Sequence, residues 1–181
     1  MKVRQLSHVL ALATAASGLL IAASVTPALA GDTPAEFSVT AGSLSISVPT
    51  GLVNLGSVTD SVLGSSVSSP LGQVKVSDAR GILATNWLAA VSASDFASVD
   101  AIVAASNVGY SAGEIASAGP GSLGALFLGH SYADIGTIQS AVATLDITGN
   151  NSATWNPTVS VFVTPGTTVA TYTGSITHSV A

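Results

Sequence analysis

Residues 74–96, VKVSDARGILATNWLAAVSASDF, constrain the fold of this chain more than any other stretch. Val74 and Val76 alternate with polar neighbours, residues 77–81 carry turn-forming side chains, and residues 82–92 continue as an apolar run that contains Trp87. Apolar residues at every second position place one face of a strand in a core, and Asp and Gly mark the turn between two strands. The stretch therefore predicts an antiparallel hairpin, with Trp87 anchoring a core between two sheets.

The same alternation recurs along most of the chain. It predicts further strands at residues 37–40, 44–48, 52–58, 138–148, 152–163 and 171–180. Pro157 lacks a backbone donor, so the strand at 152–163 either starts there or lies at the edge of a sheet. In the last strand, Tyr172, Ile176 and His178 share one face. No helical period competes with these patterns, so the expected fold class is all-β, an antiparallel immunoglobulin-like β-sandwich.

Three segments break the pattern. Residues 59–70 are rich in Ser and poor in apolar side chains, which predicts a surface loop. Residues 97–105 fit either a short helix or extended structure, and extended structure is the weak preference. Residues 107–129 form a Gly-, Ala- and Ser-rich excursion. A connection of that length in a compact domain is usually functional or partly ordered.

The first thirty residues have the three parts of a secretory signal. Lys2 and Arg4 form a positive region, residues 9–25 are apolar and small, and Ala28 and Ala30 fit a cleavage site. The alternative, a retained membrane helix, is disfavoured because the apolar run is short and rich in Ala and Thr. We therefore expect residues 1–30 to be a signal peptide and residues 31–181 a single domain without a membrane span. The expected location is secreted, at the cell surface.

Charge and cysteine content narrow the classes of partner. Removal of the signal leaves Lys75 and Arg80 against nine acidic residues, a formal charge of −7 with His neutral. Nucleic acid and anionic membrane surfaces require clustered Lys and Arg, so neither is expected as a partner. The chain contains no Cys. Its core must therefore hold without disulfides, and thiol chemistry and cysteine-based metal sites are excluded.

The sequence offers little for catalysis. His130 and His178 stand in no paired metal-ligand spacing, and no Ser lies in a G-x-S-x-G elbow. The nine acidic residues are scattered, whereas a glycosidase needs two convergent carboxylates. We therefore expect no catalytic residue, no metal and no cofactor.

The candidate binding residues are aromatic. The turn near Trp155 suggests the end of a sheet, so this ring is weighed as a surface or groove residue against a core residue, whereas Trp87 is expected in the core. Trp155, Tyr110 and Tyr132 are the speculative ligand-binding residues, presented from loops at one end of the sheets. Asp78 and Arg80 are expected to form a local ion pair at the turn.

Two blocks of this sequence resemble the WxL family of secreted bacterial cell-surface domains. The first block is matched by Val76, Asp78, Arg80, Gly81, Trp87, Val91 and Ser92, and the last by Pro165, Gly166, Tyr172, Thr173, Ile176 and Thr177. The sequence departs from the pattern at His178, which stands where the second motif has its Trp. The resemblance implies a WxL-like β-sandwich that is noncatalytic and binds the cell wall noncovalently.

Two functions therefore stay open. The first is a noncatalytic surface module that associates with peptidoglycan. The alternative is a structural or assembly protein of the envelope that meets copies of itself or another cell-surface protein through strand edges, since low charge leaves many alternating strands unguarded. A wall binder sediments with peptidoglycan as a monomer, whereas an assembly protein forms oligomers without it.

Overall fold

The computed structural model describes residues 34–40 and 42–181. The predicted signal peptide lies outside these residues, so its role stays a prediction. Residues 39–181 form one unit, which holds all the strands named below, and residues 34–38 belong to a separate one. No helix in the described part of the chain is long and apolar enough to cross a membrane.

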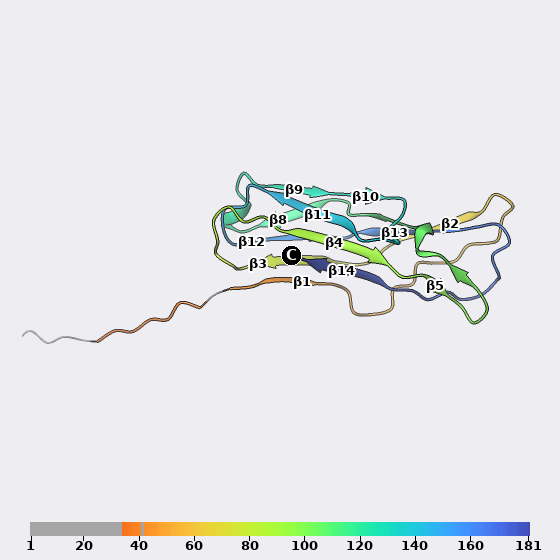
Figure 1. Ribbon diagram of the computed structural model, residues 1–181, viewed down its shortest axis with the longest axis horizontal. Helices are drawn as coiled ribbons and strands as arrows, with labels where there is room; N and C mark the ends of the chain where they lie inside the picture. The colour runs from red at the N-terminus through yellow and green to blue at the C-terminus, as the bar shows by residue number, and fades with distance from the viewer. Residues whose placement is uncertain (1–33, 41) are drawn as a thin grey trace, which may run out of the picture. The chain divides into compact units, whose positions relative to one another are not determined.

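The unit consists of three four-stranded antiparallel sheets (Figure 1). Sheet A has the order β1 (Leu44–Ser47), β3 (Val74–Asp78), β12 (Asn151–Trp155) and β8 (Ile115–Ala118). Sheet B has the order β10 (Ser131–Tyr132), β7 (Val108–Ser111), β13 (Thr158–Val163) and β2 (Ser65–Pro70). Sheet C has the order β14 (Ile176–Val180), β4 (Leu88–Ala93), β11 (Gln139–Leu145) and β9 (Leu126–Gly129). A short pair, β5 (Phe96–Ala97) with β6 (Ile102–Val103), and two 3-10 turns, η1 (Ala105–Asn107) and η2 (Pro120–Ser122), complete the unit.

Sheets A and B form one bent layer. The chain passes directly from β2 to β3, from β7 to β8 and from β12 to β13, each time leaving one sheet for the other through a short bend. At one bend the backbone N–H of Leu71 donates to the carbonyl of Pro157 over 2.8 Å, which ties two of these passages together. Sheet C lies opposite sheet A, and the facing edges meet where β1 contacts β14 and β8 contacts β9. The predicted antiparallel sandwich is confirmed.

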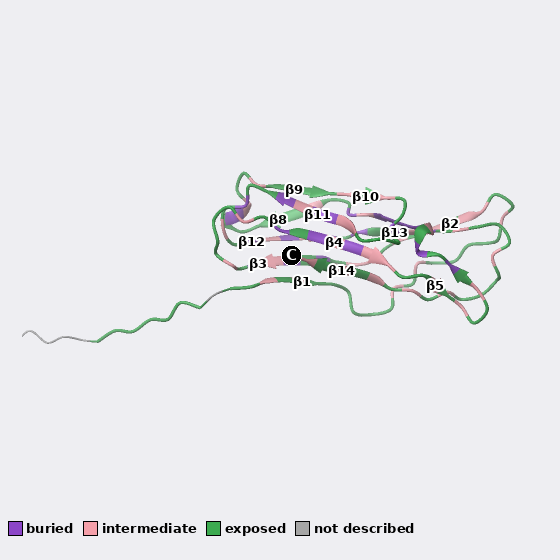
Figure 2. Ribbon diagram, in the orientation of Figure 1, coloured by how far each residue is buried: buried purple, intermediate pink, exposed green. Residues whose placement is uncertain are grey.

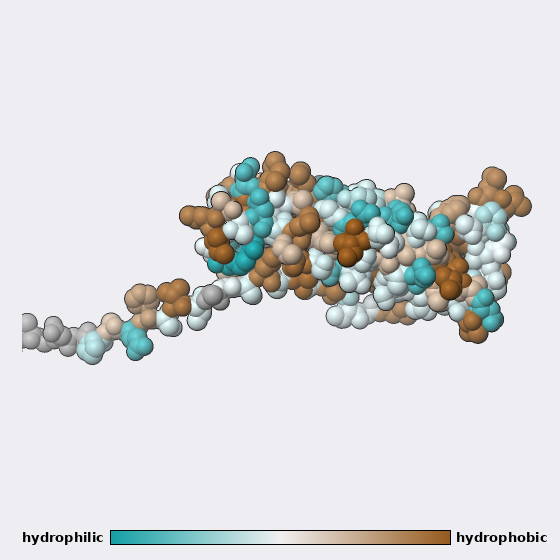
Figure 3. All heavy atoms as spheres, in the orientation of Figure 1, coloured by the Kyte–Doolittle hydropathy of each residue, from teal (hydrophilic) through white to brown (hydrophobic). Residues whose placement is uncertain are grey.

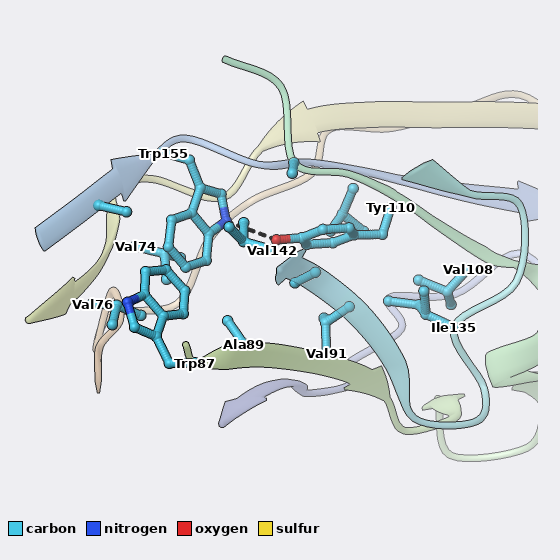
Figure 4. Packing of buried hydrophobic residues seen from close by; sticks show 14 of the residues in the cluster. Val74, Val76, Trp87, Ala89, Val91, Val108, Tyr110, Ile135, Val142 and Trp155 are labelled. Carbon is cyan, nitrogen blue, oxygen red and sulfur yellow. Dashed lines mark hydrogen bonds between the residues drawn. The ribbon is translucent and has the colours of Figure 1, made fainter. Parts of the chain in front are cut away.

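The core lies between these layers. Along β3 and β12 every second residue is buried, and Figure 2 shows buried residues concentrated along β4 and β11 of the opposite sheet. Figure 4 shows Val74 and Trp155 from one layer packed near Trp87 and Val142 from the other. Trp87 is 2% exposed, so its expected core position is confirmed. Burial of such side chains contributes about 1.5–3 kcal/mol each, which is how a chain without disulfides holds this fold.

The predicted hairpin at residues 74–96 is wrong. Strand β3 pairs with β1 on one side and β12 on the other, whereas β4 pairs with β11 and β14. Both edges of β3 are therefore occupied, and the chain crosses from one layer to the other at residues 79–87. Trp87 holds the end of this crossing in place, just before β4. Its backbone N–H donates to Thr144 Oγ1 (2.8 Å) and its Nε1 donates to Asn151 Oδ1 (3.0 Å).

The predicted strand at 152–163 is two strands in different sheets, β12 and β13, broken at Asn156 and Pro157. Strand β13 has a partner on each side, so the edge alternative for this segment is wrong and the chain restarts just after Pro157. The last predicted strand is shorter than expected, but Ile176, His178 and Val180 do share its more buried face. Within residues 97–105 the preferred extended structure is confirmed, since Ile102 and Val103 form β6, and the 3-10 turn η1 begins only at Ala105.

In four other segments the structure differs from the prediction. Residues 59–70 contain β2, and residues 107–129 contain β7, β8 and β9, whereas residues 37–40 and 52–58 are not strands. A close neighbour favours glycine at one position of these strands. A Cβ at Gly109 in β7 would lie 2.6 Å from Ser160 Oγ and 3.1 Å from the carbonyl oxygen of Tyr132, so a larger residue would require these neighbours to shift.

Candidate functional site

A hydrogen-bonded chain of three aromatic side chains leads from the core to a groove at one end of the unit. Trp155 is the last residue of β12, Tyr110 lies in β7 and His178 lies in β14. Trp155 Nε1 donates to the Tyr110 hydroxyl over 2.9 Å, the dashed bond in Figure 4. The same hydroxyl lies 3.2 Å from His178 Nε2. Three strands that are distant in sequence thus meet through polar groups inside an apolar core.

The chemistry of these groups fixes the direction of one of these two bonds. The indole N–H can only donate, so the Tyr110 hydroxyl accepts from Trp155. The same hydroxyl oxygen can accept a second bond or donate its proton, so the tautomer of His178 sets the direction of the bond to Nε2. Burial lowers the pKa of His178 to about 4, and burial also raises the pKa of Tyr110 to about 12. All three side chains are therefore uncharged at neutral pH.

The acid sensitivity of the fold follows from His178. Its pKa is about 4 in the folded chain and 6.5 when unperturbed, so between these values the unfolded chain binds a proton that the folded chain does not. Stability is then full above pH 6.5 and falls as the pH drops towards 4, by about 3 kcal/mol at most. We expect urea titrations at several pH values to show this slope and His178→Gln to flatten it. His130→Gln is the matched control, and an unchanged slope in His178→Gln would contradict the assignment.

The structure does not assemble the predicted aromatic site. Trp155 and Tyr110 are each 2% exposed, and they lie in strands rather than in loops. Trp155 takes an inward position because Asn151, Ala153 and Trp155 alternate towards the core along β12. Neither ring offers a face to a ligand. Tyr132, in the edge strand β10, lies directly opposite Tyr110, so its partly buried ring is on the core face of sheet B.

Tyr132 borders a shallow hollow of about 500 Å³ in sheet B, which we name the hydroxyl hollow. Most of its lining side chains carry a hydroxyl group, and the lining residues are Ser68, Tyr110, Ser111, Ser131, Tyr132, Ala133, Thr158 and Ser160. The strand register brings them together, since Thr158 lies opposite Ser111, which lies opposite Ser131. Sequence reasoning missed the Ser and Thr residues because they come from four strands, and only the pairing aligns them.

The hydroxyl hollow is chemically uniform. Ser131 Oγ donates to Ser111 Oγ over 2.9 Å, so the hydroxyl groups already order one another. The Tyr132 ring lies on the other face of the sheet, near the His130 ring, with centroids 6.2 Å apart and planes 20° apart. No acidic or basic side chain lines the hollow. Hydroxyl groups both donate and accept, so this surface suits a neutral polyhydroxylated ligand.

A second concavity, the apolar groove, has a volume of about 760 Å³. It lies between residues 48–58 and 167–176, and His178 lines it together with inward side chains of sheet B such as Val67 and Val161. Among the exposed large apolar residues are Leu52, Val62, Leu63, Val99 and Val169. Figure 3 shows hydrophobic surface at the right end of the view. The apolar residues of these segments can be seen in the sequence. The sequence does not show that the segments meet at one groove.

A hydrogen-bonded turn contains the motif residues Asp78, Arg80 and Gly81. Arg80 Nε and Nη2 donate to Asp78 Oδ1 (2.9 Å) and Oδ2 (2.8 Å), and the Arg80 backbone N–H donates to Oδ1 over 3.1 Å. These bonds from Arg80 hold the pKa of Asp78 below its usual value despite burial. Gly81 has φ +67° and donates its N–H to Asn150 Oδ1 over 2.7 Å. The expected ion pair is present, and it fixes the start of the crossing between layers.

The described part of the chain contains no group of three His, Asp or Glu side chains that could hold a metal ion. Tyr172, the remaining motif residue, donates its hydroxyl proton to the carbonyl of Thr168 over 2.7 Å and lines the apolar groove. Comparison of the chain with protein-family models, with curated proteins and with solved structures finds no match. The resemblance to WxL domains and the role that it implies therefore stay predictions.

Proposed function

We propose that this chain is a noncatalytic, secreted cell-surface module that binds the glycan of peptidoglycan noncovalently through the hydroxyl hollow. The observation that carries the proposal is the set of hydroxyl groups that four strands place on the outer face of sheet B, without a charged side chain. A sugar offers hydroxyl groups that pair with such donors and acceptors.

The scaffold favours binding by rigid contacts. Thr158 and Ser160 lie in β13, which has a strand on each side, so their positions are set by two ladders. A site on paired strands loses little conformational entropy when it binds, which raises affinity without adding contacts. The scarcity of charge in the hollow also fits an uncharged ligand, because no fixed charge has to be desolvated when water leaves.

The test is co-sedimentation of residues 31–181 with purified peptidoglycan. We expect saturable binding, and we expect joint replacement of Ser111 and Thr158 by Ala to weaken it at least about tenfold, because this variant loses two opposed hydroxyl groups of the hollow. Thr177→Ala is the matched control, since Thr177 is an exposed hydroxyl residue on β14, away from the hollow. Absence of binding by the unaltered chain, or equal binding by the folded variant that lacks the Ser111 and Thr158 hydroxyl groups, would overturn the proposal.

A second candidate is the assembly function, in which strand edges join copies of the chain or another envelope protein. One observation favours it: β2 is an edge strand of sheet B with the sequence SSVSSP and no charged side chain. Natural edge strands usually carry a charge or a bulge that blocks pairing with other chains. Oligomers that form without peptidoglycan would support this candidate.

A further inference from the structure

Strand β2 differs from the other sheet edges. Strands β1 and β14 lie against each other, as do β8 and β9, and β10 is only two residues long. Among the strands in the described residues, β2 is thus the long edge without a neighbouring strand on its outer side. Its six residues pair with β13 without a register shift, and no charged residue occurs between Asp60 and Lys75. The edge is regular and uncharged.

The pairing with β13 shows which backbone groups face outward. Leu71 N–H donates to the Pro157 carbonyl, and the register places Pro70 opposite Thr158. Hydrogen bonds alternate along an antiparallel pair, so Ser65, Val67 and Ser69 bond to β13 in phase with Leu71. Ser66 and Ser68 then direct their N–H and C=O groups away from the sheet. The missing N–H of Pro70 falls on the same outer side, where its loss costs no ladder bond.

We propose that two copies of this chain pair through β2 as an antiparallel, two-fold symmetric dimer centred on Val67. The proposal rests on the assembly function and names its partner, strand and register. Residues 65–69 read Ser-Ser-Val-Ser-Ser in both directions. Pairing about Val67 therefore sets Ser66 opposite Ser68 of the second copy, and each such pair exchanges two backbone bonds, about four in total. Sheet B doubles in width.

The register is specified by side chains as well as by backbone. Centred on Val67, the two Val67 side chains meet directly in a non-hydrogen-bonded pair, where cross-strand contacts are closest. A shift of the pairing by one residue puts the outward groups out of phase, and a shift by two places Val67 against Ser. The uncharged edge lets two copies approach, although each mature chain is negative overall. Few bonds form, so we expect a weak, concentration-dependent dimer.

Ser66→Pro tests the backbone bonds. It removes an outward N–H, while the ladder to β13 and the hydroxyl hollow, which Ser66 does not line, stay intact. For residues 31–181 we expect sedimentation equilibrium over about a hundredfold range of concentration to show a monomer–dimer equilibrium. Ser66→Pro should raise the dissociation constant at least about tenfold, since it removes half of the backbone bonds. Ser66→Ala, which keeps the N–H, is the matched control and should dimerise as before.

Cysteine cross-linking tests the register in this Cys-free chain. Val67→Cys should form an intermolecular disulfide under mild oxidation, because directly opposed residues lie about 4.5 Å apart at Cα. Ser69→Cys should not, since the two copies of residue 69 are offset by about 13 Å along the strands. A monomer at every concentration would overturn both the dimer and self-assembly. Oligomers that persist in Ser66→Pro, or equal cross-linking at both positions, would overturn the β2 pairing and leave self-assembly standing.

Discussion

Replacing Trp155 by Ala is expected to lower the free energy of unfolding by about 3–5 kcal/mol, because it empties a large buried volume that neighbouring strands cannot fill. Trp155 is 2% exposed and belongs to the largest fully buried side chains of the described chain. The substitution also removes the indole donor to the Tyr110 hydroxyl. Urea denaturation of residues 31–181, followed by circular dichroism, measures the loss.

Two further variants separate the contributions to this effect. Trp155→Phe keeps most of the volume and loses the hydrogen bond, so it should cost clearly less than Trp155→Ala. Tyr132→Ala removes a ring that is only partly buried against the core, so it should cost less than Trp155→Ala. A loss below about 1 kcal/mol for Trp155→Ala would contradict the core placement. Because this variant perturbs folding, any loss of wall binding in it would report unfolding, and the hydroxyl residues of the hollow are the informative positions.

The second large effect is expected at the ion pair that begins the crossing between layers. The Asp78 side chain is 4% exposed and its partner Arg80 is 23% exposed. Arg80→Ala leaves a buried carboxylate without its cation, and breaking a buried pair in this way costs about 3–5 kcal/mol. The partial exposure of Arg80 admits water to the site, so we expect the lower part of that range. Chemical denaturation at pH 7 measures it.

The pH dependence identifies the cause. The pKa of Asp78 is lowered in the folded chain by bonds from Arg80, so the pair stabilises above the unperturbed value of 3.8 and its contribution is lost as the pH falls through the folded pKa. The cost of Arg80→Ala should therefore shrink in acid, where Asp78 becomes protonated. Lys75→Ala is the matched control, because Lys75 is exposed on β3 and forms no salt bridge among the described residues. An equal cost at both pH values would argue for lost packing instead.

Parts of the candidate site were visible in the sequence. Tyr110, Tyr132, Trp155 and His178 were singled out from their residue types and their surroundings. Alternation along β14 placed His178 on the more buried face, and the structure has it there. Nothing local showed that Tyr110 lies between Trp155 and His178, because the three residues belong to three different sheets.

The sequence alone determined the fold class and the identity of many inward residues. Period-two alternation acts within one strand, and the burial of Val74, Val76 and Val159 follows from it without knowledge of any partner. The local ion pair between Asp78 and Arg80 was equally visible, because the two residues are neighbours in sequence.

Only the tertiary structure decided which strands pair. The same Asp-x-Arg-Gly residues can turn a chain back into a hairpin or carry it across to the other layer, and here both edges of β3 are taken by β1 and β12. Likewise, Ser- and Gly-rich segments became β2 and β7 because β13 offers each a ladder. Strand edges that are distant in sequence compete for backbone partners and buried area. Which strands pair therefore depends on the whole chain and is not encoded in any single segment.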